Sequence, residues 1–203
     1  MAYKTAKEEH AFQTFHKDLK TGFFPEVLFL VGEEEYLIEW AAKSLANKFV
    51  DKSMIDIDFV KMSENEELDE ILASCDTFSI FSERRVIWAK DFAPLIKKTA
   101  KGFGDKELEK ITDYLASPNP QSILIFSTST PEEGSSLVKL LRKQCKVYTF
   151  DRLDRPQLNG FAEKRFKAAL QSGSKNCKKR KAPRFAAPKR VLYSKKCKKA
   201  RLL

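Results

Sequence analysis

The stretch LFLVGEEEYLIEW, residues 28–40, decides the fold class. An apolar run from Val27 to Val31 predicts a buried strand that ends at Gly32, and a helical pattern of apolar residues follows at once. A strand that passes through a glycine turn into a helix is a common place for phosphate binding, because backbone N–H groups at a helix N-terminus attract phosphate oxygens. Residues 27–40 therefore have the strand–turn–helix pattern typical of nucleotide-binding scaffolds.

The turn at Gly32 lacks the side chains that a phosphate loop needs. The pattern G-x-x-x-x-G-K-[ST] supplies glycines for close backbone approach and a lysine that neutralises phosphate charge. Here the positions of the second glycine, the lysine and the hydroxyl hold Leu37, Ile38 and Glu39. The carboxylates of residues 33–35 would repel a triphosphate, although acidic groups in a first turn favour the helix dipole. We therefore expect an adaptor with a dead nucleotide site and no cofactor, in preference to a working ATPase.

The rest of the chain alternates strand and helix patterns. Strands are expected at residues 27–31, 56–62, 84–90, 122–128 and 146–150, with helices between them and a first helix at 7–20. The run at 122–128 is almost wholly apolar, which predicts a central strand covered on both faces. Alternating strands and helices predict a three-layer α/β fold, in which a parallel five-stranded sheet has helices on both faces.

Several local patterns predict where the helices begin. Ser63 and Glu66 have the spacing of a capping box, in which each side chain satisfies a backbone N–H of the other residue. Asp105 is a second candidate cap, and residues 130–133 offer a threonine cap, a proline and a glutamate for a third helix. Asp154 is expected to cap a last helix that carries the apolar residues Leu158, Phe161, Ala162, Phe166 and Ala169 on one face.

A second informative stretch, CDTFSIFSERR at residues 75–85, falls between a helix and the third strand. Its large apolar residues are Phe78, Ile80 and Phe81, and its polar residues include Ser79 and Ser82. Apolar residues in a loop either fold back onto the core or protrude as anchors for a partner. We expect Phe78 to pack on the core, and Ile80 and Phe81 to protrude as a plug for a pocket on a partner.

Composition and charge separate a body from a tail. The chain of 203 residues is 42% hydrophobic with 16 Phe, which is enough for a substantial core. Its net charge of +10 is concentrated at one end, because residues 171–203 hold 13 of the 38 Lys and Arg and none of the 28 Asp and Glu. The body is therefore mildly acidic. We expect a domain at residues 1–170 and a basic, disordered tail at 171–203.

The tail has two interpretations. Its most basic segment is typical of a nuclear-localisation or nucleic-acid-binding patch, with possible contacts from Lys178, Lys179, Arg180, Lys181 and Arg184. A change of reading frame in A-rich coding sequence would also produce lysine-rich sequence without acidic residues, followed by early termination. A truncated or frameshifted product is the favoured interpretation, and a functional tail is the alternative.

Other function classes find little support in the sequence. The cysteines Cys75, Cys145, Cys177 and Cys197 are scattered, and with only His10 and His16 beside them they form no metal-binding pattern. Reduced thiols in a cytoplasmic protein are expected. The N-terminus has no apolar signal segment, and no apolar run approaches the length of a membrane span. No nucleophile–base pair or set of catalytic carboxylates stands out, so no intrinsic catalysis is expected.

The chain resembles the family of delta subunits of the bacterial DNA polymerase III clamp loader. The resemblance is carried by VLFLVGEEEYLIEWAAKSL, SCDTFSIFSERRVIWAKDF, SILIFSTST and KVYTFDRLDRPQLNGFAEKRF, and covers about residues 24–169. The SIFSERR segment is the most specific part. The resemblance implies an AAA+-like (P-loop-type) N-terminal domain that binds no ATP, in a subunit that binds the sliding clamp and helps to open it. Any polymerase activity would belong to the holoenzyme.

The resemblance also implies a site. In the family a small apolar pair enters a hydrophobic pocket on the clamp; here the pair is Ile80 and Phe81, with Ser79 and Ser82 beside it. The family often has Leu at the first position of the pair. Family members continue into two further helical regions that assemble the loader with its other subunits, whereas here the pattern stops near Ala169. Two functions remain: a clamp-binding module in DNA replication, and a nucleic-acid-binding protein that acts through its tail.

Overall fold

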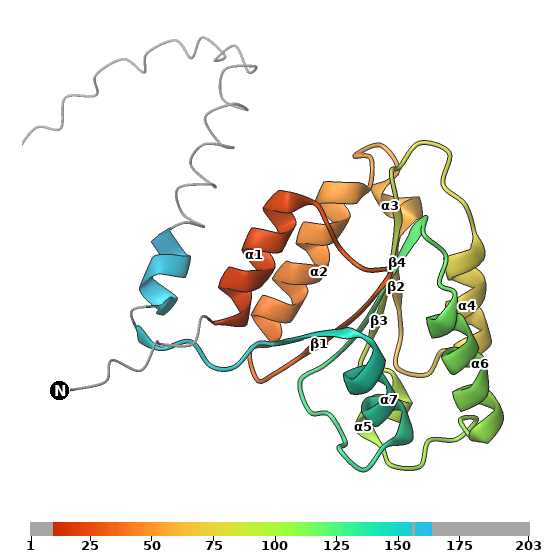
Figure 1. The fold of residues 1–203 in the computed structure, drawn as a ribbon. Helices are drawn as coiled ribbons and strands as arrows, with labels where there is room; N and C mark the ends of the chain where they lie inside the picture. The colour runs from red at the N-terminus through yellow and green to blue at the C-terminus, as the bar shows by residue number, and fades with distance from the viewer. Residues whose placement is uncertain (1–9, 156, 164–203) are drawn as a thin grey trace, which may run out of the picture. The chain divides into compact units, whose positions relative to one another are not determined.

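A computed structural model describes residues 10–155 and 157–163. The chain divides into two compact units between Leu153 and Asp154, and the first unit contains the sheet. Five parallel strands lie in the order β2-β3-β4-β1-β5. The parallel five-stranded α/β sheet is confirmed, and so is the central place of the most apolar strand, β4 (Figure 1). The strands are β1 (Val27–Val31), β2 (Phe59–Met62), β3 (Arg85–Lys90), β4 (Ser122–Thr128) and β5 (Lys146–Thr149).

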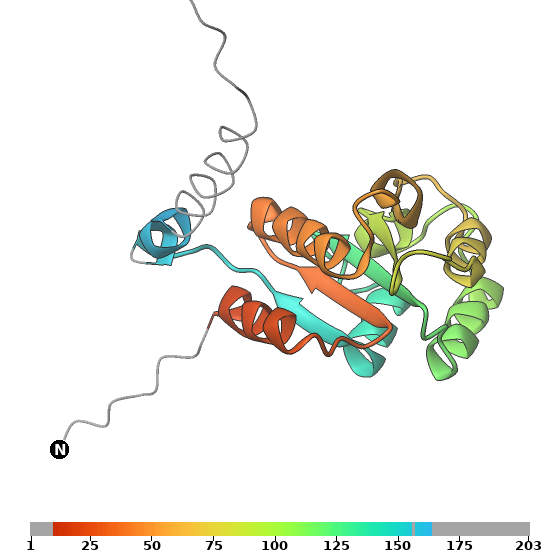
Figure 2. The ribbon, with the colours of Figure 1, turned by 90° about the horizontal axis from the view of Figure 1, so that it is seen from above.

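One face of the sheet is covered by α1 (Ala11–Thr21) and α2 (Glu35–Phe49), which lie side by side (Figure 2). Phe15 from α1 is fully buried there and meets the rings of Phe24, Trp40, Tyr148 and Phe150, with ring centroids 5.1–6.2 Å apart. These aromatic contacts connect the first helix to the last strand and to the residue that follows it.

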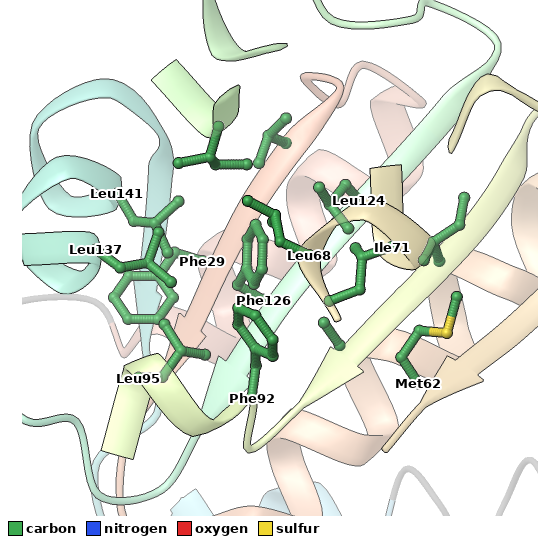
Figure 3. Close-up of a cluster of buried hydrophobic side chains, with 14 of the residues drawn as sticks. Phe29, Met62, Leu68, Ile71, Phe92, Leu95, Leu124, Phe126, Leu137 and Leu141 are labelled. Atoms are coloured by element: carbon green, nitrogen blue, oxygen red, sulfur yellow. The ribbon is translucent and has the colours of Figure 1, made fainter. Parts of the chain in front are cut away.

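The opposite face packs against four helices: α4 (Leu68–Asp76), α5 (Ala93–Ile96), α6 (Asp105–Ala116) and α7 (Ser136–Gln144). Figure 3 shows Phe29 and Phe126 of the sheet among Leu68, Ile71, Leu95, Leu137 and Leu141 of these helices. Alternate residues of β1 and β4 face this cluster, and the residues between them face α1 and α2. Burial on both faces explains the continuous apolar runs Val27–Val31 and Ile123–Phe126 in these two strands.

The second expected strand, 56–62, is shorter than predicted. Residues Ile55–Asp58 form a short helix, α3, and the strand begins at Phe59. The backbone N–H groups of Ile57 and Asp58 bond to the carbonyl of Met54 at 2.9 and 2.8 Å. The side chain of Asp58 is almost completely buried, so a tertiary interaction overrides the apolar alternation that favoured a strand.

Three expected helix starts are wrong by one to several residues. Ser63 bonds to the side chain of Glu66 at 2.9 Å, and the helix begins later, at Leu68. Gly104 is the N-cap of α6, and Asp105 is its first residue. Residues 130–133 form no helix start, because the N–H of Glu132 bonds to the carbonyl of Leu95 at 2.8 Å and α7 begins only at Ser136.

The second unit is described only as far as residue 163. The expected cap at Asp154 is confirmed: the N–H of Gln157 donates to its carboxylate at 2.8 Å, and the N–H of Asp154 donates to the Gln157 side chain at 3.0 Å. Among the described residues, 155 and 157–163 are helical. The apolar residues Phe166 and Ala169, the expected start of the first helix at 7–9, and the basic tail at 171–203 lie outside the described residues.

Candidate functional site

Three large exposed apolar side chains lie in the loop of residues 77–84, between α4 and β3. Ile80 is 88% exposed and Phe81 is 69% exposed, so the expectation that both protrude is confirmed. Phe78 is 70% exposed, and the expectation that it packs on the core is wrong. The loop thus presents three large apolar side chains to solvent instead of two.

The 77–84 loop lies at the amino ends of the parallel strands, because it leads directly into β3. α3 leads into β2 at the same end of the sheet, where Figure 1 shows it near the loop. Most of the large apolar side chains exposed on the described part of the first unit precede a strand in this way: Phe23 before β1, Ile57 before β2, and Phe78, Ile80 and Phe81 before β3. Tyr36, at the start of α2, lies at the opposite end. The amino end of the sheet is therefore its apolar end.

A buried carboxylate holds the 77–84 loop in place. The hydroxyls of Ser79 and Ser82 both donate to Oδ2 of Asp58, each at 2.5 Å. The side chain of Asp58 comes from α3 and is only 2% exposed as a residue. The two serines flank Ile80 and Phe81 in the chain. Their hydroxyls point to Asp58, so their bonds fix the loop from inside.

Two arginines anchor the end of the loop to the sheet. Arg84 donates to the carbonyls of Phe24 and Ser122 at 2.9 and 3.1 Å, and its guanidinium lies over the Phe49 ring. Burial lowers the pKa of Arg84, although the nearby carboxylates of Glu26 and Glu83 oppose that effect. Arg85 donates to the carbonyls of Ser74 and Ile57 and lies 3.7 Å from Asp58. The exposed apolar residues thus stand on a fixed base.

Sequence reasoning missed Asp58 because it placed the residue within a strand. One signal was available: Asp58 is a single acidic residue between Ile57 and Phe59, and a carboxylate buried beside apolar groups needs partners. The hydroxyls that satisfy it come from residues more than twenty positions away in the chain. No local pattern could have identified them.

The turn at Gly32 occupies the carboxyl ends of the strands, and the chain itself fills it. The N–H of Glu34 at the start of α2 donates to the carbonyl of Phe150 at 3.1 Å. Gly32 has φ +132°, and a Cβ on it would stand 2.2 Å from the same carbonyl oxygen. A backbone carbonyl therefore takes the place beside the helix N-terminus that a phosphate oxygen would need.

The acidic residues of this turn have partners in the first unit. Glu33 forms an exposed ion pair with Arg152 at 2.9 Å, and Glu35 accepts a hydrogen bond from the Ser129 hydroxyl at 3.3 Å. These contacts place carboxylates around the turn, where they disfavour a polyphosphate. In the described residues, no three His, Cys, Asp or Glu side chains are grouped so that they could hold a metal ion.

The candidate nucleic-acid contacts of the tail cannot be placed in this way. Lys178, Lys179, Arg180, Lys181 and Arg184 all lie outside the described residues. Within the part of the chain that is described, no helix combines the length and apolar character needed to cross a membrane.

Comparisons with known proteins agree with this architecture. The family described as DNA polymerase III, delta subunit, matches residues 28–151. Over 135 residues the chain is 27% identical to DNA polymerase III subunit delta of Bacillus subtilis, which covers 66% of this chain and 38% of that protein. The solved structure of the Bacillus subtilis DNA clamp loader delta protein has a similar fold, with a TM-score of 0.63 and 24% identity over 74% of this chain and 45% of that one.

The family match at residues 28–151 includes the turn at Gly32, the 77–84 loop and all five strands except Val27, the first residue of β1. The chain spans about two fifths of the length of the curated relative it matches. The family match covers more than half of the chain, and the chain belongs to the DNA polymerase III delta subunit family.

Proposed function

We propose that this chain binds a sliding clamp through the 77–84 loop and helps to open the clamp for loading onto DNA during replication. The single observation that carries the proposal is the exposure of Ile80 and Phe81 on a loop fixed by Asp58 and Arg84. Ile80 and Phe81 would enter an apolar pocket of the clamp, and Phe78 would lie at the rim of that contact.

The energetics of binding favour such a loop. A few buried apolar or aromatic anchors supply most of the affinity of a typical interface, and each can contribute 2 kcal/mol or more. An anchor held in one conformation before binding loses less conformational entropy when it enters the pocket. The hydrogen bonds of Ser79 and Ser82 supply this preorganisation. We therefore assign these two serines a positioning role, in place of the direct contact with the clamp expected from the sequence.

The carboxyl end of the sheet supports a role without intrinsic catalysis. The carbonyl of Phe150 fills the turn at Gly32, and Glu33 and Glu35 border it. We propose that the chain uses a nucleotide-binding scaffold without nucleotide, as a component of the DNA polymerase III holoenzyme. Its partners would be the clamp and, through regions present in full-length relatives, the other loader subunits. This function places the chain in the bacterial cytoplasm.

A double variant, Ile80→Ser with Phe81→Ser, tests the proposal. The probe is the purified sliding clamp of Bacillus subtilis, immobilised for a binding measurement with the full 203-residue chain. We expect affinity to fall by about thirtyfold or more, which corresponds to about 2 kcal/mol. Thermal stability should hardly change, since both side chains are exposed. Opening is tested separately, as release of the clamp from circular DNA.

Tyr36→Ser is the matched control, because Tyr36 is also exposed but lies at the other end of the sheet. It should leave clamp binding unchanged. Unchanged binding by the double variant, or a large loss of stability in it, would show that the loop is no plug and that family membership supports the fold alone.

A second candidate function rests on the charge of the tail. Residues 171–203 hold 13 Lys and Arg with no acidic residue, a composition suited to phosphate contacts. Binding of this kind releases counterions, so affinity for DNA should fall steeply as salt rises, whereas apolar binding to the clamp should respond far less. A chain ending at residue 170 should lose DNA binding and retain clamp binding. If the shortened chain binds DNA as well as the full one, the tail has no such function.

A further inference from the structure

Asp58 is at the centre of a hydrogen-bond network that includes the serines on either side of Ile80 and Phe81. One of its oxygens, Oδ2, accepts the hydroxyls of both Ser79 and Ser82 at 2.5 Å. The Ser79 oxygen in turn accepts the N–H of Ser82 at 3.0 Å. Ile80 and Phe81 therefore lie in the chain between two serines whose hydroxyls donate to the same carboxylate oxygen.

The donors and acceptors of the hydrogen bonds around Asp58 can be assigned. An ionised carboxylate can only accept hydrogen bonds, so both serine hydroxyls must donate to it. The lone pairs of those hydroxyls are then free to accept backbone N–H groups, which are supplied by Ser82 for Ser79 and by Asp51 for Ser82, the latter at 3.1 Å. Hydrogen bonds to a charged acceptor are stronger than neutral ones, and connected bonds strengthen one another. The carboxylate thus orders the loop, α3 and the turn before α3 together.

The charge of Asp58 has a partner on its other oxygen. Nε of Arg85 lies 3.7 Å from Oδ1, and the rest of the guanidinium bonds to the carbonyls of Ile57 and Ser74. A buried carboxylate without partners would be very unfavourable, whereas one that has an ion pair and hydrogen bonds can persist. Arg85 is the first residue of β3, so the network is attached to the sheet at the point where the loop ends.

We propose that Asp58 is a positioning residue, which holds Ile80 and Phe81 in the conformation that enters the clamp. This inference rests on the proposed function. The apparent affinity of a binding segment falls in proportion to the fraction of molecules in the competent conformation. Without its bonds to Asp58, the loop samples other conformations, and clamp binding weakens although no residue that touches the clamp has changed.

The test removes the donors and leaves Asp58 in place. In the full chain, Ser79→Ala with Ser82→Ala deletes both hydroxyls but keeps the ion pair between Asp58 and Arg85. We expect about a tenfold loss of affinity for the Bacillus subtilis clamp. We also expect faster hydrogen exchange at the backbone amides of residues 82 and 51, because each loses its hydroxyl acceptor.

Two further variants complete the design. Ser79→Thr with Ser82→Thr restores both hydroxyls and should recover affinity and slow exchange. Ser63→Ala is the matched control, because Ser63 also donates to a carboxylate, that of Glu66, but follows β2 at the other end of the sheet. It should change neither quantity. If the double alanine variant does not fold, the single variants Ser79→Ala and Ser82→Ala give the same comparison.

Each outcome decides between two hypotheses. Full affinity in the double alanine variant overturns the positioning role of Asp58. Clamp binding through Ile80 and Phe81 is tested separately, by the variant Ile80→Ser with Phe81→Ser. Weaker binding with unchanged amide exchange also overturns it, since the serines would then contact the clamp directly. Weaker binding together with faster exchange at Ser82 and Asp51, both restored by threonine, is the result expected.

Discussion

The two ends of the sheet differ in the way their loops are filled. At the carboxyl ends, the carbonyl of Phe150 occupies the turn at Gly32 and accepts a hydrogen bond from the N–H of Glu34 at the start of α2. At the amino ends, the 77–84 loop leaves Ile80 and Phe81 in solvent. Ligands of open α/β sheets usually bind at the carboxyl ends. In this protein the Gly32 turn at that end is occupied by the Phe150 carbonyl, and the opposite end carries the apolar surface suited to a partner.

The largest expected difference between the two ends is in how much an aromatic side chain contributes to the free energy of unfolding. Phe150 is fully buried beside Phe15 and Tyr148, so Phe150→Ala should lower the free energy of unfolding by about 3–5 kcal/mol. Phe78→Ala should change it by less than about 0.5 kcal/mol, because Phe78 is exposed. Urea unfolding of both variants measures the difference. Similar losses in the two variants would mean that the 77–84 loop is part of the core.

The next largest effect is expected at the Gly32 turn. Gly32→Ala must place a Cβ 2.2 Å from the Phe150 carbonyl oxygen at a φ of +132°, so a loss of about 3 kcal/mol is expected from clash and backbone strain. Gly102 also has a positive φ, +78°, but has open space around it. Gly102→Ala should therefore cost only about 1 kcal/mol, as strain alone. Equal unfolding midpoints for the two variants would show that the turn is not closed by residue 150.

A smaller effect is expected where β5 is attached to α1. Lys146 and Tyr148 both donate to Asp18, at 2.7 and 2.6 Å. Burial raises the pKa of Asp18, but the hydrogen bonds from Lys146 and Tyr148 outweigh it and hold that pKa below its usual value. A carboxylate with a lowered folded-state pKa stabilises the fold above the unfolded pKa of about 4 and loses that effect as pH falls through the lower folded value.

Asp18→Asn should therefore cost up to about 1 kcal/mol at pH 7, a value typical of partly exposed ion pairs. The difference in free energy of unfolding between the variant and the parent chain should shrink as pH is lowered from about 4. Urea titrations at several pH values measure this difference. A gap that stays constant down to pH 2 would show that the ionisation of Asp18 contributes nothing to the attachment of β5.

The smallest expected effect is that of added nucleotide on thermal stability. A ligand that binds the native state raises Tm by mass action, by an amount that grows with its concentration over Kd. ATP at millimolar concentration, with or without Mg²⁺, should leave Tm within the scatter of replicate scans, because the Phe150 carbonyl and the nearby carboxylates oppose phosphate at the turn. A reproducible rise in Tm would show that the carboxyl end of the sheet still binds nucleotide.

Most of the sheet could be predicted from the sequence because its strands are covered on both faces. β1 is apolar along its whole length and β4 from Ile123 to Phe126, and the observed bounds of both strands equal those expected. The second strand was less predictable. Residues 56–58 alternate as a strand does, but they form a helical turn whose Asp58 side chain bonds to distant serines. Local alternation carries no information about a partner that lies more than twenty residues away.

Helix starts show the same limit. At Ser63 and Glu66 the capping residues are present, but their side chains bond to each other and the helix begins at Leu68. At Asp154 the same kind of pattern produced the expected cap. A capping pattern shows which hydrogen bonds are available locally, and the packing of neighbouring segments decides which of them form.

The sequence by itself determined the alternation of elements, the parallel sheet and the loss of the phosphate-loop residues, because these depend on hydrophobic period and on residue identity at fixed spacing. It also predicted that Ile80 and Phe81 are exposed. Only the tertiary structure decided that Phe78 is exposed with them, that Phe150 closes the Gly32 turn, and that Asp58 fixes the loop. The physical reason is that exposure and hydrogen-bond pairing depend on segments far apart in the chain, which meet only when the sheet has formed.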